Sequence, residues 1–173
     1  AASAKHILAS AGDDDDAGWT IREVTTPALW REKRRLHELT PERPDGKPVD
    51  AASWVRLERG KVRGGYMSAW LIERDGEPCG AFGLSFTSRM VRFKNLFVAP
   101  EHRARGAASA SLRLMARQVL AHGHDAHCRI GCFVLPGGHG QRVYERAGFR
   151  VVGRQIEWTA PAVAASEPAK ALR

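Results

Sequence analysis

The chain has 173 residues, 43% of them hydrophobic and 27% charged, which is enough for one domain with a buried core. Its formal net charge of +8 suits a polyanionic cofactor, nucleic acid or an acidic membrane surface. No apolar run reaches the roughly 18 residues of a membrane span, and no signal peptide is recognisable. The three cysteines lack the paired spacing of a disulfide framework, so the sequence predicts a cytoplasmic protein without membrane contact.

Residues 1–18 differ in composition from the rest of the chain. They are mostly Ala, Ser, Gly and Asp, with consecutive aspartates from Asp13 to Asp16. We expect a flexible leader or a tag remnant here, although its apolar pair Ile7-Leu8 could dock on the body. Residues 19–159 then form the folded domain, and the Ala- and Pro-rich residues 160–173 form a tail.

Capping residues and apolar periodicity divide the domain into alternating strands and helices. Thr26 and Asp50 would cap two helices, which begin at Pro27 and Ala51. A hairpin turn is predicted at Asp75-Gly76. The other expected elements are the strands Trp19–Val24, Met67–Glu73, Cys79–Phe86, Met90–Val98, Cys128–Leu135 and Phe149–Thr159, and the helices Ala107–Ala121 and Gly140–Ala147. Strands joined through helices indicate an α/β fold, with a mixed central sheet of about six to seven strands flanked by helices.

In the expected strand Met90–Val98, the apolar residues do not keep a regular alternation. Val91 and Phe93 are apolar at odd positions, whereas Leu96 and Val98 are apolar at even positions. A strict period of two cannot bury both pairs on one face. One extra residue near Lys94-Asn95, a β-bulge, would reconcile them; the alternative is a strand buried on both faces near its end.

The stretch after this strand has the features of an anion site. Arg103 and Arg105 precede a helix that begins with Gly106, Ala107 and Ala108. No Ser, Thr, Asp or Asn stands immediately before Gly106 to cap the first-turn N–H groups. These donors and the positive end of the helix dipole favour an external anion, and the small residues let it come close. We predict a pyrophosphate site.

Two motifs together resemble the GNAT superfamily of acyl-CoA-dependent N-acetyltransferases. Arg103-x-x-Gly106-x-Ala108 matches that family's Q/R-x-x-G-x-G/A loop, and Tyr144-x-x-x-Gly148-Phe149 matches a later family motif. The order of predicted elements across residues 19–159 also fits. The resemblance implies a splayed central sheet and acetyl-CoA as the acyl-donor cosubstrate.

The resemblance also implies a division of roles. The CoA pyrophosphate would be held by backbone N–H groups of Arg103, Ala104, Arg105, Gly106, Ala107 and Ala108. Pantetheine would pair with the strand end, and the thioester carbonyl would be polarised there, at Leu96, Phe97 and Val98. Tyr144 would lie beside the sulfur and protonate the leaving thiolate, since its phenol has a pKa near 10. A neutral amine would attack the thioester directly, without a covalent enzyme intermediate.

The sequence departs from the family pattern in two places. Gly137 and Gly140 stand where the family often has Asn and Ala, which removes an expected cofactor contact. The acidic residue frequent on the strand before the loop is also absent. The general base therefore stays open among His37, Glu38, His139 and a water relay.

The acceptor is predicted from charge alone. Residues 29–62 carry basic and acidic side chains without a strongly acidic cluster, which favours a small amine or an amino acid with its own carboxylate over a polycation. A protein or peptide amine is an alternative acceptor. A non-catalytic acyl-CoA-binding or partner-binding domain is an alternative function, and a homodimer is left open. Nucleic-acid binding is not expected, because interleaved aromatics and a recognition-helix motif are missing.

A histidine-rich stretch invites a metal interpretation. His122, His124, His127 and Cys128 straddle a helix end, a loop and a strand start, so the ligands of a tetrahedral site would have to converge from three elements. A solvated loop is favoured and no metal is predicted. Cys132 is interpreted as a small core residue rather than a nucleophile.

Overall fold

The computed structural model describes residues 1–10, 16, 18–39, 50–87, 90–124 and 128–156. These residues form a six-stranded sheet in the order β1-β6-β5-β4-β3-β2. The strands are β1 Ala2–Ser3, β2 Trp19–Glu23, β3 Ser68–Arg74, β4 Glu77–Phe86, β5 Met90–Val98 and β6 Arg129–Gly131. The helices are α1 Ala4–Ala9, α2 Pro27–Glu38, α3 Ala51–Arg63, α4 Ala107–Ala121 and α5 His139–Arg146, with a 3-10 turn at Pro100–His102.

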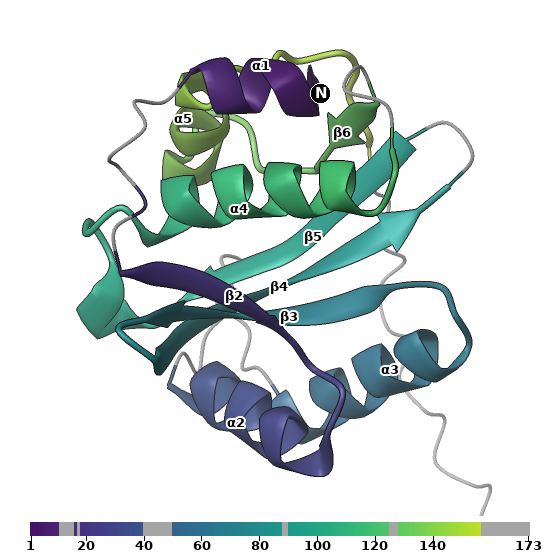
Figure 1. The fold of residues 1–173 in the computed structure, drawn as a ribbon, viewed down its shortest axis with the longest axis vertical. Coiled ribbons are helices and arrows are strands. Elements are labelled where there is room, and N and C mark those ends of the chain that lie inside the picture. Colours follow the sequence, from purple (N-terminus) through teal and green to yellow (C-terminus); the bar gives the residue numbers. More distant parts are fainter. Residues whose placement is uncertain (11–15, 17, 40–49, 88–89, 125–127, 157–173) are drawn as a thin grey trace, which may run out of the picture.

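Helices cover both faces of this sheet. Figure 1 shows α1, α4 and α5 above it and α2 and α3 below it. Strands β5 and β6 are parallel, whereas the other neighbouring strands are antiparallel. The mixed sheet flanked by helices confirms the predicted fold class. No described helix is both long and apolar enough to cross a lipid bilayer.

Each face of the sheet has its own core. On the α4 side, Phe82, Phe93 and Met115 are among the fully buried side chains. On the α2 and α3 side, the core is smaller and includes Leu36 and Leu71. The sheet therefore separates two compartments, and each compartment meets a different part of the candidate site.

The helices α2 and α3 begin at the predicted caps. The Oγ1 of Thr26 accepts from the backbone N–H of Leu29 at 3.3 Å, and Oδ1 of Asp50 accepts from that of Ser53 at 3.0 Å. These bonds satisfy N–H groups that have no partner within the helix. Leu57 of α3 is an apolar residue that points outward, since it is 53% exposed.

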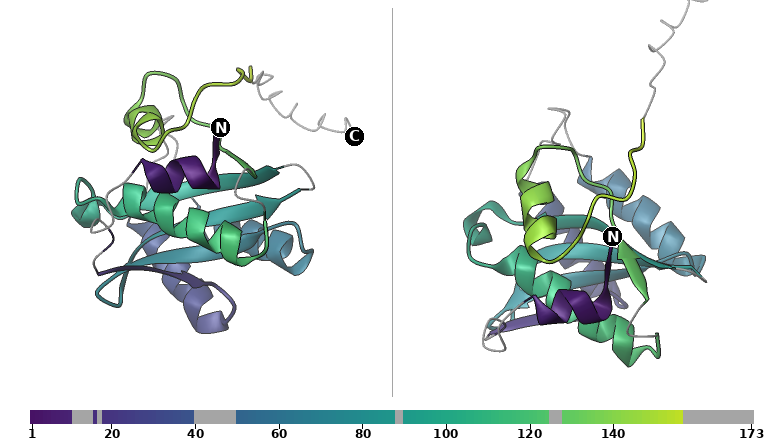
Figure 2. Two further views of the ribbon diagram at one scale, coloured as in Figure 1. Left: turned by 45° about the horizontal axis from the view of Figure 1, so that its top comes forward. Right: turned by 90° about the horizontal axis from the view of Figure 1, so that it is seen from above.

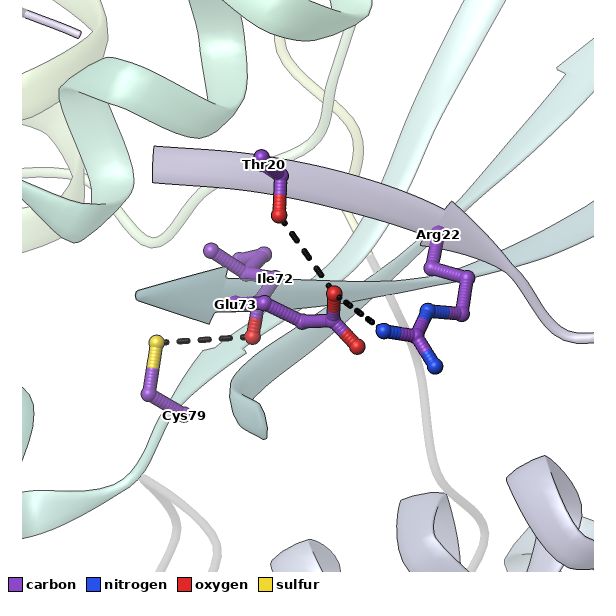
Figure 3. Close-up of polar contacts among 5 residues, drawn as sticks. All are labelled: Thr20, Arg22, Ile72, Glu73 and Cys79. Atoms are coloured by element: carbon purple, nitrogen blue, oxygen red, sulfur yellow. Dashed lines mark hydrogen bonds and ion pairs between the residues drawn. The ribbon is translucent and has the colours of Figure 1, made fainter. Parts of the chain in front are cut away.

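The turn between β3 and β4 is also the predicted one. Asp75 and Gly76 have φ angles of 51° and 87°, which matches the type I′ turn preferred by two-residue hairpins. Close to this end of the sheet, the buried carboxylate of Glu73 accepts from Thr20 at 3.4 Å and pairs with Arg22 at 3.0 Å (Figure 3). These contacts tie β2 to β3.

Strand β5 contains the predicted bulge. Its register against β4 shifts between Ala81, opposite Phe97, and Gly83, opposite Lys94, so two residues of β5 lie opposite one of β4. Asn95 in the bulge has a φ of 53°. Because of this extra residue, the two apolar pairs that broke the alternation lie together with the α4-side core: Val91, Phe93, Leu96 and Val98. The end of the strand is also buried on its other face, where Phe97 packs against the α2 and α3 side, so both the bulge and the alternative are observed.

The first ten residues correct the prediction of a flexible leader over residues 1–18. Strand β1 pairs antiparallel with β6, and Ile7 of α1 is 1% exposed in the core against α4. Farther along, the carboxylate of Asp16 pairs with Arg113 and Arg117 of α4, both at 2.6 Å. The apolar pair Ile7-Leu8 docks on the body as the alternative predicted, with Ile7 buried and Leu8 partly buried in the core that includes α4.

The C-terminal part of the sheet is shorter than predicted. The strand expected over residues 128–135 is reduced to β6, and residues 149–156 form no strand. The edge of β6 is occupied by β1, and the backbone N–H of Arg150 donates to the carbonyl of Ala1 at 3.1 Å. Figure 2 shows the start of the chain beside the segment after α5. Residues 157–159 and the tail predicted for 160–173 lie outside the described residues.

Candidate active site

The helix α4 begins without a side-chain cap, as predicted. Its N-cap residue is Gly106, whose φ is 89°, and Ala104 just before it has a φ of 58°. A Cβ added to Gly106 would meet no atom within 4 Å, so the backbone here is open to an approaching group. The positive end of a 15-residue helix therefore faces outward with its first-turn N–H groups.

The two arginines of the loop differ in what they contact. The Nε of Arg103 donates to the carbonyl of Val98 at 3.0 Å, so this side chain folds back onto the end of β5. Arg105 is exposed beside the helix start. The bond from Arg103 thus attaches the loop to the strand that precedes it, a role that the motif did not predict.

The sheet opens between β5 and β6. Their parallel ladder joins Met90–Arg92 to Arg129–Gly131, and after Gly131 the chain leaves the sheet. On its other side, β5 stays paired with β4 as far as Val98. The β6 side of Leu96, Phe97 and Val98 therefore lies beyond the β5–β6 ladder, and this is where the resemblance puts pantetheine.

Tyr144 lies where the two strands diverge. Its ring packs edge-on against those of Phe93 of β5 and Phe149, with ring centroids 6.3 Å and 5.4 Å apart. The side chain is 9% exposed. Burial raises the pKa of Tyr144 above its ordinary value, and the neighbouring Cys132 thiol adds to the shift. The phenol is therefore protonated at neutral pH and can act as an acid.

A cluster of buried polar side chains lies on the other face of β5, below the bulge. The Nδ2 of Asn95 donates to Oε1 of Glu58 at 2.8 Å, and Nζ of Lys33 lies 3.2 Å from Oε2 of Glu58. His37 stacks on Phe97 with ring centroids 5.3 Å apart. We call Lys33, His37, Glu58 and Asn95 the bulge cluster.

The three side chains considered as bases differ in exposure and in their contacts. Glu38 is exposed and pairs with Arg34 at 2.8 Å, and His139 is exposed at the start of α5. His37 belongs to the bulge cluster, and burial with the charge of Lys33 lowers its pKa to about 4. It is a weak base at neutral pH.

Sequence reasoning missed Glu58. A signal was present, because Ala51, Val55, Glu58 and Val62 follow helical spacing and share one face of α3. A charged residue at such a position is buried only when it has a partner, and that partner comes from α2. The inward stripe was visible in the sequence, whereas the partner was not.

The histidine-rich stretch and the double-glycine stretch have ordinary structural contacts. The rings of His122 and His124 stack on that of Phe86, with centroids 6.3 and 5.4 Å away. His127 is outside the described residues. The backbone N–H of Gly137 donates to Oε1 of Gln141 at 2.7 Å, within α5's own N-terminal region. Cys132 is partly buried against the α4-side core, consistent with a packing role.

The comparison with family models decides the classification. The model of the acetyltransferase (GNAT) domain matches residues 66–151, which include the bulge, the loop before α4 and Tyr144. The chain belongs to the GNAT superfamily. Members of this superfamily are acetyl-CoA-dependent N-acetyltransferases, and the chain is an enzyme of that class.

Solved GNAT structures share the fold at low sequence identity. The aminoglycoside acetyltransferase AAC(6')-Iy, in complex with a CoA-linked bisubstrate analogue, is 19% identical, with a TM-score of 0.61 over 83% of this chain and 98% of its own. An acetyltransferase from Clostridium acetobutylicum with acetyl-CoA is 16% identical, with a TM-score of 0.56 over 82% and 96%. Spermidine N-acetyltransferase SpeG from Vibrio cholerae is 16% identical, with a TM-score of 0.58 over 79% and 82%. Among curated proteins, none matches the sequence significantly.

Proposed function

We propose that this GNAT enzyme transfers an acetyl group from acetyl-CoA to the primary amine of a small molecule. One observation carries the proposal: β5 leads from Tyr144 and the bulge directly to the uncapped start of α4. Strand β5 thus runs from the ring of Tyr144, which packs on its Phe93 from α5, past a splayed strand edge to an anion site. The bound acetyl-CoA, CoA and CoA conjugate of neighbouring structures support the choice of cosubstrate.

Each part of this path has a chemical role. The N–H groups at Gly106, Ala107 and Ala108, with Arg105, bind the pyrophosphate. The edge at Leu96, Phe97 and Val98 pairs with pantetheine, and a backbone N–H there polarises the thioester carbonyl. The amine attacks this carbonyl in a ternary complex, and Tyr144 donates its proton to the leaving thiolate. Arg103 holds the loop against β5 through Val98.

The acceptor is a small amine, and an amino-acid-like molecule with its own carboxylate fits best. Neighbouring enzymes include acetyltransferases named for aminoglycosides and for spermidine, which supports a small-molecule amine in general. The bulge cluster contributes one carboxylate and one buried lysine, so it does not form the acidic cleft that a polycation requires. The cytoplasmic location and a homodimer remain predictions.

The experiment is a calorimetric titration with acetyl-CoA followed by a thiol-release assay with a panel of amines. We expect binding of acetyl-CoA and turnover with at least one small amine. Tight binding without thiol release from any amine or peptide would instead identify a non-catalytic acyl-CoA-binding domain. Absence of acetyl-CoA binding would refute both functions.

A further inference from the structure

The bulge cluster contains buried polar atoms that have no hydrogen-bond partner among the described residues. Lys33, His37 and Glu58 are 0%, 8% and 1% exposed. Within the described chain, Nζ of Lys33, Nε2 of His37 and Oε2 of Glu58 are buried without a well-directed hydrogen bond, although the first and last form an ion pair. The indole Nε1 of Trp54 is also buried without a hydrogen bond, and the centroid of its ring lies 6.5 Å from that of His37.

Such a concentration has an energetic cost. A buried polar group without a hydrogen bond costs about 1–3 kcal/mol, and most proteins avoid it. Several such groups around one carboxylate indicate a place where a polar ligand supplies the missing partners. The ligand must donate a hydrogen bond to Oε2 of Glu58, and an ammonium or amine does so.

The cluster also lies at the correct point along β5. Asn95 holds Oε1 of Glu58 and is followed immediately by Leu96, the first residue of the edge assigned to the thioester. Tyr144 belongs to the opposite face of the sheet, with the α4-side core. An amine that enters from the α2 and α3 side would thus meet Glu58 on one side of β5 while the sulfur meets Tyr144 on the other.

Strand β5 itself carries no carboxylate near the bulge. Arg92, Lys94 and Asn95 occupy the stretch before the cofactor edge. Helix α3 brings the carboxylate of Glu58 to the same place through the hydrogen bond with Asn95. The left-handed conformation of Asn95 directs this contact, since the bulge reverses which face the next side chains occupy.

We propose that Glu58 is the proton acceptor for the substrate ammonium, an inference that rests on the acetyltransferase function proposed above. One ammonium proton moves to Oε2 of Glu58, which becomes a neutral carboxylic acid. The freed amine forms a C–N bond with the acetyl carbonyl, and the C–S bond of the thioester breaks. The nitrogen loses its second proton to solvent while Tyr144 donates its proton to the leaving thiolate. The Tyr144 phenolate then regains a proton from solvent, and Glu58 returns its proton to solvent.

The titratable groups that face Glu58 come from three elements. Lys33 and His37 face it from α2, Lys61 lies on its own helix, and Lys94 lies on β5. Burial lowers the pKa of Lys33 despite the opposing effect of Glu58. Lys33 and Asn95 are positioning residues, since Lys33 pairs with Oε2 of Glu58 at 3.2 Å and Asn95 donates to Oε1 at 2.8 Å, and together they orient the carboxylate.

The test compares Glu58→Gln with Glu73→Gln. Glu73 is a second buried glutamate, 3% exposed and paired with Arg22 between β2 and β3, so it controls for the removal of a buried charge (Figure 3). For an alkylamine acceptor at about pH 7, we expect kcat to fall by about 100-fold or more in Glu58→Gln. Acetyl-CoA affinity should stay unchanged, and Glu73→Gln should keep its turnover.

An alkoxyamine acceptor separates proton transfer from a structural effect. Its nitrogen is already neutral at about pH 7, so it needs no proton acceptor before attack. The fold-decrease in kcat caused by Glu58→Gln should therefore be at least about ten times smaller with the alkoxyamine than with the alkylamine. Equal losses with both acceptors, or an alkylamine kcat within about 3-fold of the wild type, would overturn the assignment.

A second variant covers the case in which Glu58→Gln does not fold. Glu58→Asp keeps a negative charge in the bulge cluster but shortens the side chain by one methylene, which withdraws the carboxylate from the acceptor. Its ratio of alkylamine to alkoxyamine turnover should fall, and an unchanged ratio would refute Glu58 as the proton acceptor. Wild-type inactivity on every amine would refute the proposed function itself, which separates the two failures.

Discussion

Three residues of the proposed site have backbone conformations that most side chains disfavour. Asn95, Ala104 and Gly106 have φ angles of 53°, 58° and 89°. A non-glycine residue in the left-handed region costs about 1–2 kcal/mol. The bulge and the loop before α4 are thus built by local strain that the surrounding sheet and helix compensate. This strain determines where the backbone donors point.

Gly106 allows two substitutions with different consequences. Gly106→Ala should lower stability by about 1–2 kcal/mol because of its φ, yet still bind acetyl-CoA, since the added Cβ meets nothing within 4 Å. Gly106→Glu adds a negative charge at the pyrophosphate position and should weaken acetyl-CoA binding by about 100-fold or more. Calorimetry with both variants checks this, and equal affinities would remove Gly106 from the cofactor site.

Tyr144→Phe tests the acid role. The phenol is buried and its pKa is raised, so it is protonated across the neutral range and available to the thiolate. We expect kcat to fall by about 10²-fold while acetyl-CoA affinity barely changes. Steady-state kinetics beside a binding titration measures both quantities. Unchanged turnover would leave Tyr144 as a core residue between Phe93 and Phe149.

His37 makes stability depend on pH. Its pKa is about 4 in the folded protein and 6.5 when unperturbed, so the unfolded chain binds more protons between these values. Stability therefore falls as pH falls from about 6.5 to about 4, by about 2 kcal/mol between pH 7 and pH 5. Urea unfolding of the wild type and of His37→Gln at both pH values measures the difference. The same pH sensitivity in the variant would contradict the assignment.

At the scale of elements, β1 and α1 complete the upper layer. Strand β1 covers the edge of β6, and α1 covers part of α4. An uncovered edge would offer unpaired backbone groups to other chains. Short elements such as these are stable only through their tertiary contacts, since a six-residue helix is marginal in isolation.

Ile7→Ala measures the contribution of α1. Ile7 is 1% exposed, so its truncation should lower stability by about 2–4 kcal/mol. Lys5→Ala on the exposed side of the same helix is the matched control and should change stability by less than about 0.5 kcal/mol. Chemical denaturation of both variants provides the values. A negligible effect of Ile7→Ala would mean that α1 does not remain docked in solution.

For the whole molecule, acetyl-CoA would add contacts between elements that already share the α4-side core. The proposed cofactor contacts β5, the start of α4 and Tyr144 of α5 together. A ligand at 100 times its Kd stabilises the folded state by about 2.7 kcal/mol, which corresponds to a rise in Tm of about 5–10 °C. Thermal unfolding with and without acetyl-CoA should show this rise, and Gly106→Glu should lose it. A wild-type Tm that is the same with and without acetyl-CoA would contradict the proposed cofactor site.

Local rules determined much of this protein from its sequence. The caps Thr26 and Asp50, the Asp75-Gly76 turn and the bulge near Asn95 were predictable, because each depends on neighbouring residues and a fixed geometry. The uncapped start of α4 was readable for the same reason. Each of these features is a property of a few consecutive residues.

Only the tertiary structure decided the features that depend on a distant partner. Residues 149–156 have the composition of a strand but form none, since β1 occupies the edge of β6. Glu58 lies on a visible inward stripe, yet its burial depends on Lys33 from α2 and Asn95 from β5. A strand needs an edge and a buried charge needs a counterpart, and the sequence alone specifies neither.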